Sequence, residues 1–206
     1  TSTGKTWLLA GLAVAIFKSF DEVGVYIAAA SPESNLRTLS WGEITKLMAR
    51  APHLFTDTIS TDLTISKTHL VRGKPKPSMS RIMGIPIPSQ GRDAKMETAF
   101  SGKHHPHAQA RLYDEADGIP EPCYVGADGC LSGTGWQRSV LFLNPKSRDG
   151  RPYDLIESGR AHHIVLSAFD HPNVITGQSI IHGAVSQEVT VHRINAWTSA
   201  LNPSEI

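Results

Sequence analysis

The chain has 206 residues, of which 40% are hydrophobic and 19% charged, and its formal net charge is +1 at pH 7. This length is sufficient for one well-buried core, while the near-neutral charge means that any nucleic-acid binding must rest on a local patch. The apolar run from Trp7 to Phe17 is shorter than the ~20 residues that span a bilayer, so we expect a soluble protein without a membrane partner.

The amino-terminal part alternates between helix and strand patterns. Lys5 to Phe20 carries large apolar residues at helical spacing and no proline, which predicts a helix. Val23 to Ala30 is a continuous apolar run, as expected of a strand buried on both faces of a parallel sheet. Ser31 and Pro32 then predict the N-cap and first turn of a helix that ends near Arg50. Helix, buried strand and helix in succession indicate an α/β layer architecture.

A basic stretch follows. Between Asp62 and Asp93 the sequence has no acidic residue and six basic ones: Lys67, Arg72, Lys74, Lys76, Arg81 and Arg92. The prolines of KPKP (74–77) predict a loop that joins two antiparallel strands, Ile65–Val71 and Ser80–Ile87. Two interpretations stay open for this hairpin: a solvated surface, or a sequence-independent contact of Lys74 and Lys76 with DNA phosphates.

The rest of the chain predicts three further strands and a last helix. The strands are Gln109–Tyr113, Ser139–Leu143 and His163–Phe169, and the helix is Ala184–Thr198. Before the first of these strands, the histidines of HHPH (104–107) offer poor metal geometry, which favours a solvated or DNA-facing loop.

The cysteines carry little chemistry. Cys123 and Cys130 match no zinc spacing and are too few for a disulfide framework, so we expect reduced thiols in an intracellular protein.

The residues that open the chain, TSTGKT, match the second half of G-x-x-x-x-G-K-[ST]. In that motif, backbone N–H groups at a helix N-terminus bind phosphates, the lysine reaches the β and γ phosphates, and the hydroxyl holds Mg²⁺. We therefore expect Thr3, Gly4, Lys5 and Thr6 to bind nucleotide and Thr6 to be a metal ligand. The motif's leading glycine would lie before Thr1, so the first strand and the start of the loop are expected to be missing. The alternative is a coincidental GKT.

Polar side chains follow two of the predicted strands. RLYDEAD places Asp114 at the end of a buried strand, where a carboxylate can hold Mg²⁺, and Glu115 beside it, where a second carboxylate can polarise an attacking water. LFLNP places Asn144 at the end of another strand, where its amide could contact both the γ-phosphate and the water. The alternatives are an acidic turn after an edge strand and a plain Asn-Pro turn.

Three stretches are similar to the ATPase half of a bacteriophage terminase large subunit: AFSGKHHPHAQARLYDEADGIPE, LFLNPKSRDGRPYDL and LSAFDHPNVITG. The similarity runs from Thr1 to about Trp197. It implies a three-layer phosphate-loop NTPase fold, with a mostly parallel central sheet flanked by helices, of the type with an additional strand and a catalytic glutamate. It further implies one ATPase domain over residues 1–206, with the family's nuclease domain absent and no nuclease activity in this chain.

The resemblance also implies roles and partners. Glu115 would be the catalytic base, Asn144 a member of the coupling motif, Thr6 and Asp114 Mg²⁺ ligands, and ATP the cofactor. A basic residue acting on a neighbouring subunit's ATP would be one of Arg92, Lys95 and Lys103.

The implied partners are double-stranded DNA, the portal protein, the terminase small subunit and further copies in a homo-oligomeric ring. The implied location is the host bacterial cytoplasm. A helicase-type DNA-dependent ATPase and an inactive prophage remnant are the alternatives.

Overall fold

The computed structural model describes residues 4–30, 32–88, 93–131, 135–146 and 148–198. They fall into two compact units, one of Thr6–Arg160 and one of Thr1–Lys5 with Ala161–Ile206. The expectation of a single ATPase domain over the whole chain stays a prediction.

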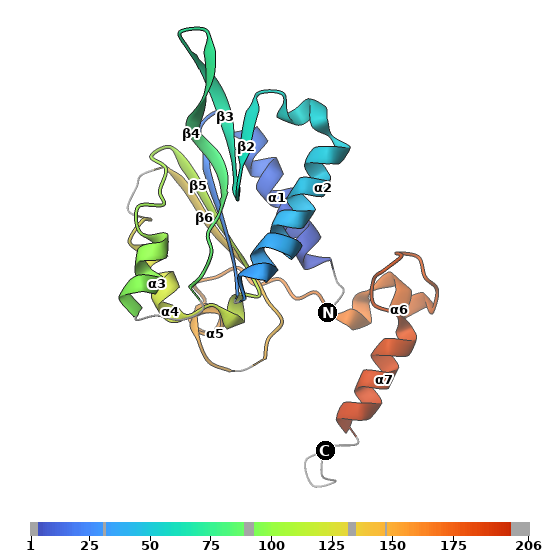
Figure 1. Ribbon diagram of the computed structural model, residues 1–206. Coiled ribbons are helices and arrows are strands. Elements are labelled where there is room, and N and C mark those ends of the chain that lie inside the picture. Colours follow the sequence, from blue (N-terminus) through green and yellow to red (C-terminus); the bar gives the residue numbers. More distant parts are fainter. Residues whose placement is uncertain (1–3, 31, 89–92, 132–134, 147, 199–206) are drawn as a thin grey trace. The chain divides into compact units, whose positions relative to one another are not determined.

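A six-stranded sheet with the order β2-β3-β4-β1-β5-β6 forms the centre of the larger unit (Figure 1). Its strands are β1 (Gly24–Ala29), β2 (Thr58–Thr61), β3 (Thr64–Val71), β4 (Lys74–Gly84), β5 (Ala108–Asp114) and β6 (Trp136–Phe142). β4, β1, β5 and β6 pair in parallel, whereas β3 pairs antiparallel with both β2 and β4. Every residue of β1 and β5 is buried, which confirms the doubly covered parallel strand that the apolar run predicts.

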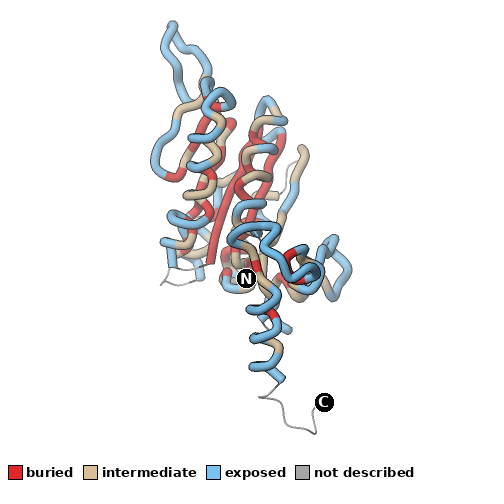
Figure 2. Tube along the Cα trace, turned by 90° about the vertical axis from the view of Figure 1, so that its right-hand side faces the viewer, coloured by how far each residue is buried: buried red, intermediate tan, exposed pale blue. Residues whose placement is uncertain are grey.

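Helices cover both faces of the sheet, so the unit has three layers (Figures 1 and 2). Alternation along β1 decides which side chains face which layer. Val25 and Ile27 pack with the core of α1 (Lys5–Ser19) and of α2 (Trp41–Arg50). Tyr26 and Ala28 pack with the core of the helices on the opposite face, α3 (Asp93–Phe100) and α4 (Glu121–Asp128). A mixed α/β fold with a mostly parallel sheet between helices is confirmed.

Two predicted helices are found with altered bounds. α1 begins at Lys5 as predicted and ends at Ser19, one residue before the predicted Phe20. The second helix begins as a π-helix over Asn35–Ser40 before it continues as α2. It ends at Arg50, where Ala51 leaves the helical conformation ahead of Pro52. The predicted cap at Ser31 lies outside the described residues.

The basic hairpin forms, but its turn is not where the prolines predict it. Arg72 and Gly73 make the turn, with φ of 51° and 74°, and KPKP lies inside β4. Two consecutive residues with positive φ give the tight turn that suits a twisted hairpin. Among the described residues, β4 pairs with β1 only from Arg81 onward, so its outer edge is open at KPKP. An open edge tolerates strand residues without an N–H, and the loop prediction is therefore wrong.

Two later predictions need correction. β6 begins at Trp136, three residues before the predicted strand, and ends at Phe142. His163–Phe169 is not a strand: it is irregular backbone up to the 3₁₀ turn Ala168–Asp170, and Ile164 and Val165 are exposed. A β-rich composition forms a strand only beside a partner, and no described strand pairs with this segment.

Three further helices complete the described chain. They are α5 (Arg151–Glu157), α6 (Pro172–Thr176) and α7 (Gln187–Thr198), the last of which starts three residues after its predicted beginning. In the unit that contains α6 and α7, the buried amide of Asn173 is bonded at both ends to the backbone of Ile181, at 2.8 Å each. This pair of bonds closes the loop between the two helices.

Candidate nucleotide and metal site

The carboxyl ends of the parallel strands bring the predicted acidic residues to one edge of the sheet. Asp114 is the last residue of β5 and is level with Ala29 of β1 and Phe142 of β6. The Ala30 N–H donates to the Asp114 carbonyl at 3.1 Å, which extends the β1–β5 ladder by one residue. In open α/β sheets, this edge is where ligands bind.

One hydrogen bond connects the GKT segment to this edge. Thr6, the second residue of α1, donates from Oγ1 to Asp114 Oδ2 at 3.0 Å, across 108 residues of chain. Ser40, at the end of the π-helix, donates from Oγ to the same oxygen at 2.9 Å. Two hydroxyl groups from different helices therefore hold one carboxylate oxygen.

The other carboxylate oxygen of Asp114, Oδ1, accepts no hydrogen bond from the described residues. Asp114 is only 3% exposed, and its Oδ1 is buried without a hydrogen-bond partner among the described residues. Burying an unsatisfied carboxylate oxygen is costly, so the arrangement calls for a further partner. A hard divalent cation suits it, because Mg²⁺ binds oxygen ligands and commonly takes only one or two from the protein. Thr6 and Asp114 therefore fit a magnesium ion.

Within the described ranges, no group of three or more His, Cys, Asp or Glu side chains could hold a metal ion. A cation at Asp114 would need hydroxyl, water or phosphate oxygens as its remaining ligands.

Glu115 leaves the strand in an unusual backbone conformation. Its φ and ψ are 49° and 48°, in the left-handed region, which costs an L-residue about 1 kcal/mol or more. The following residue is held firmly, since Ala116 is fully buried and its carbonyl accepts from the Tyr124 hydroxyl at 2.7 Å. The packing thus fixes the backbone directly after Glu115.

Two side chains from the segment after β6 approach Glu115. Asn144 donates from Nδ2 to Glu115 Oε1 at 3.5 Å, and Lys146 Nζ lies 3.7 Å from Oε2. Lys146 also pairs with Asp117 at 3.1 Å, and this hydrogen bond raises the pKa of the lysine. Asn144 and Glu115, predicted separately from two strand ends, are thus brought together.

The remaining nucleotide-binding predictions concern the residues before Thr6. Lys5 begins α1, and Gly4 has a φ of 78°, a conformation that favours glycine. Thr3 lies outside the described residues. The roles of Lys5 and Gly4 in phosphate binding stay predictions.

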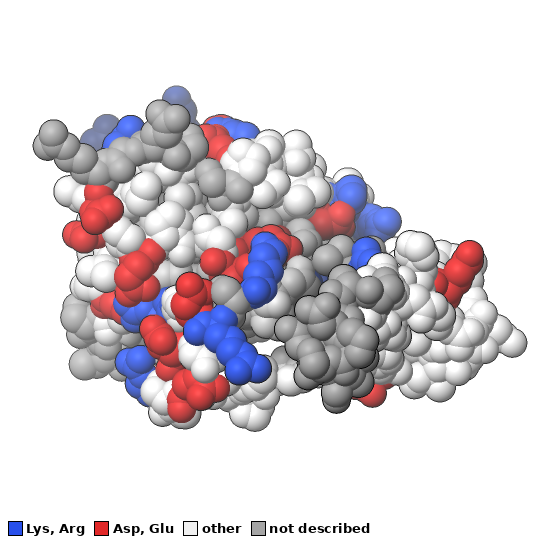
Figure 3. All heavy atoms as spheres, turned by 90° about the horizontal axis from the view of Figure 1, so that it is seen from below, with Lys and Arg blue, Asp and Glu red and all other residues white. Residues whose placement is uncertain are grey.

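Two of the three candidate trans-acting residues, Lys95 and Lys103, lie in the described part of the chain. Arg92 lies outside the described residues, and Lys95 is exposed on α3. Lys103 follows α3, and its carbonyl accepts from the Arg111 guanidinium at 2.7 Å. On the face that Figure 3 shows, Lys and Arg side chains lie interspersed with Asp and Glu side chains. The geometry does not select one of the three.

The candidate DNA contacts lie at the other end of the sheet. Lys74 and Lys76 are exposed near the tip of the β3–β4 hairpin, opposite Val71 and His69. Since residues two apart in a strand share a face, both ammonium groups belong to one side of the ribbon. Lys67 is different: its ammonium donates to the backbone carbonyls of Phe20 and Asp21, and desolvation lowers its pKa. Lys67 is thus held against the end of α1, while both interpretations of the hairpin stay open.

Two residues of the site belong to no motif in the sequence. Ser40 has no recognisable pattern around it, and its contact with Asp114 depends on how two helices pack on one sheet face. Lys146 stands two residues after Asn144, so the charge in LFLNPK was a usable signal.

The histidine loop before β5 is only partly solvated. His105 is buried and desolvation lowers its pKa, whereas His107 is exposed and its Nε2 lies 3.0 Å from Glu22. The prediction of a solvated or DNA-facing loop is therefore wrong for His105. Burial likewise raises the pKa of the Cys123 thiol to about 11, which makes it a poor nucleophile.

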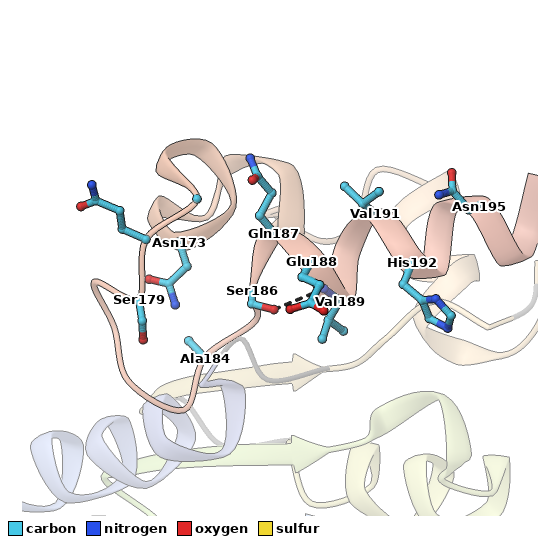
Figure 4. A pocket seen from close by; sticks show the side chains of 12 residues that line it. Asn173, Ser179, Ala184, Ser186, Gln187, Glu188, Val189, Val191, His192 and Asn195 are labelled. Carbon is cyan, nitrogen blue, oxygen red and sulfur yellow. Dashed lines mark hydrogen bonds between the residues drawn. The ribbon is translucent and has the colours of Figure 1, made fainter.

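A hollow of about 870 Å³ lies in the unit with α6 and α7 (Figure 4). Its lining is mostly amide, hydroxyl and aliphatic, with one carboxylate, Glu188, and one imidazole, His192. Ser186 accepts from the Val189 N–H at 3.2 Å, as a residue before a helix commonly does.

Neither protein-family models nor curated proteins match the chain. Among solved structures, the chain is similar to the large terminase of a thermophilic bacteriophage, with 14% identity and a TM-score of 0.46. The match covers 70% of this chain and 32% of that one, so the chain spans about a third of its neighbour's length.

The described helices give no sign of a membrane span, since none is both long enough and apolar enough to cross a bilayer.

Proposed function

We propose that the chain is the ATP-hydrolysing motor part of a phage terminase large subunit, which drives double-stranded viral DNA into a procapsid. The observation that carries the proposal is the hydrogen bond from Thr6 to Asp114. It joins the hydroxyl of GKT to the carboxylate that ends a buried parallel strand, although the two are 108 residues apart. A coincidental GKT would not be expected to meet that carboxylate.

The fold belongs in this proposal to the phosphate-loop NTPases with an additional strand and a catalytic glutamate. Gly4 and Lys5, with Thr3, would bind the phosphates at the start of α1. Thr6 and Asp114 would hold Mg²⁺, which when bound neutralises charge on the β and γ phosphates.

Glu115 would act as the general base beside the two Mg²⁺ ligands. Its carboxylate would orient a water in line with the γ-phosphate and accept its proton. Asn144, within 3.5 Å of Oε1, would contact that water or the phosphate and report the state of the nucleotide. Lys146 would hold the second oxygen and limit the directions in which the carboxylate can turn.

The DNA contact would lie on the hairpin. Lys74 and Lys76 stand on one side of a ribbon whose sequence has no carboxylate, which suits sequence-independent attraction to phosphates. The portal protein and the small subunit would be partners in the host cytoplasm. Copies of the chain would form a ring in which Arg92, Lys95 or Lys103 reaches the neighbouring site.

The test is nucleotide binding and turnover by the purified protein with duplex DNA, single-stranded DNA or neither. We expect Mg-ATP binding and hydrolysis that duplex DNA stimulates. Lys5→Ala should reduce hydrolysis by about 10²-fold or more, the usual effect of removing one preorganised charge at a reacting group. Lys46→Ala, which removes an exposed lysine of α2, is the matched control.

Three outcomes would contradict the proposal. Stimulation by single-stranded DNA alone would indicate a helicase-type ATPase. A folded protein that binds no nucleotide would indicate an inactive remnant. Equal turnover in Lys5→Ala and Lys46→Ala would remove the phosphate role of GKT.

A further inference from the structure

Ser40 is a polar residue at a position where the spacing of buried residues predicts an apolar one. It lies four residues after Leu36 and four before Ile44, and all three are buried almost completely. Residues four apart share one face of a helix, so position 40 faces the same core as its two aliphatic neighbours. A buried hydroxyl group is costly unless it is hydrogen-bonded. Its bond to Asp114 Oδ2 is what satisfies Ser40 here.

The neighbouring hydroxyl groups show what Ser40 does not do. Thr38 and Thr45 donate to carbonyls four residues back in their own helix, at 2.5 and 3.0 Å. That local bond is the usual choice of a hydroxyl inside a helix. Ser40 instead donates to a carboxylate 74 residues away. Its hydroxyl therefore serves the site edge rather than its own helix.

The backbone around Ser40 is also uncommon. Asn35–Ser40 is a π-helix, and the Trp41 N–H bonds to the carbonyl of Leu36, five residues back. Such segments are rare and occur mostly at functional sites. One extra residue in a turn rotates the later part of the helix by about 100° relative to a regular α-helix. The π-helix thus sets the angle at which Ser40 meets the sheet.

We propose that Ser40 is a positioning residue for the metal-binding carboxylate, an inference that rests on the proposed function. With Thr6 and Ser40 both donating to Oδ2, Asp114 is held in the one orientation that leaves the buried Oδ1 for a divalent cation. Thr6 alone would leave the carboxylate free to rotate about this single bond. Ser40 contacts neither metal nor nucleotide and acts through Asp114.

The test measures metal affinity directly. Mn²⁺ binding in the presence of ADP is followed by electron paramagnetic resonance for the wild-type protein, Ser40→Ala and Thr38→Ala. We expect about 10-fold weaker Mn²⁺ binding in Ser40→Ala, which is the usual effect of losing an outer-shell partner of a ligand. Thr38→Ala loses a hydroxyl from the same π-helix and should match the wild type. ADP binding in EDTA should be equal in all three.

A second variant guards against misfolding. Ser40→Cys keeps the size of the side chain but donates more weakly, so its Mn²⁺ affinity should lie between those of Ser40→Ala and wild type. Mn²⁺ affinity equal to wild type in both Ser40 variants would overturn the role of Ser40 and leave the proposed function standing. A wild-type protein that binds no Mn²⁺ with ADP would overturn both.

Discussion

The two ends of the central sheet differ in how they use polar side chains. At the carboxyl end, Thr6, Ser40 and Asp114 are linked by hydrogen bonds of 3.0 and 2.9 Å around a carboxylate that is 3% exposed. At the amino end, β3 and β4 continue past β1 as a two-stranded ribbon (Figure 1). Lys74 and Lys76 of this ribbon are exposed. Seven residues of β4 precede its pairing with β1, which corresponds to about 23 Å of strand.

This difference separates two kinds of function within one sheet. A buried carboxylate edge can fix a few atoms in one geometry, which hydrolysis requires. An exposed ribbon with spread charges can attract a phosphate backbone without selecting a sequence. β4 belongs to both regions, since its tip carries Lys74 and its base pairs with β1. Substitutions at the carboxylate edge should therefore reduce hydrolysis without changing DNA binding, and substitutions in the ribbon should do the reverse.

The largest expected effect is at the carboxyl edge. Glu115→Gln keeps the size of the side chain and a hydrogen-bonding group but removes the base, so turnover should fall by about 10²-fold or more. Single-turnover hydrolysis measures this loss. The affinities for Mg-ATP and for duplex DNA, measured by filter binding, should stay near wild type. Glu157→Gln, an exposed residue at the end of α5, is the control. Lost nucleotide affinity with retained turnover would mean that Asp114 and Glu115 exchange roles.

An intermediate effect compares the stability of the two regions. Leu112 in β5 is fully buried, and Leu112→Ala should lower the free energy of unfolding by about 2 kcal/mol or more through lost burial and a cavity. Leu70 at the hairpin is 75% exposed, and Leu70→Ala should change it by less than about 0.5 kcal/mol. Urea unfolding monitored by circular dichroism measures both. Similar losses would show that the ribbon is part of the packed core.

The smallest effect concerns the ribbon's charges. Changing Lys74 and Lys76 together to Ala should make the slope of log affinity against log salt shallower by about 2 for duplex DNA of any sequence. Mg-ATP binding should not change. Changing Lys46 and Arg50 of α2 to Ala removes the same charge elsewhere and controls for net charge. A slope equal to that of this control would favour the interpretation of the hairpin as a solvated surface.

The local sequence predicted correctly those features that depend on the residues of a single element. The apolar run over Val23–Ala30 predicted a doubly covered strand because only such a strand lacks a polar face. The order of GKT, DE and Asn144 along the chain placed candidate residues at strand and helix ends. Parallel strands then bring those ends to one edge, as the 3.5 Å approach of Asn144 to Glu115 illustrates.

Tertiary structure decided which segments pair as strands, because pairing depends on the strand that lies beside each segment. KPKP was misread because the cost of a proline in a strand depends on whether the strand's other edge is paired. HIVLSAF formed no strand because β-propensity measures packing beside a partner rather than a preference of the backbone alone.

Ser40 is the clearest case of this limit. Ser31 and Pro32 predicted the start of a helix that ends near Arg50, but the phase that turns Ser40 towards Asp114 comes from a π-helix packed on the sheet. By itself the sequence determined which residue types lie at which element ends. Only packing decided which of them meet, because a hydrogen bond between residues 74 apart depends on the placement of every element between them.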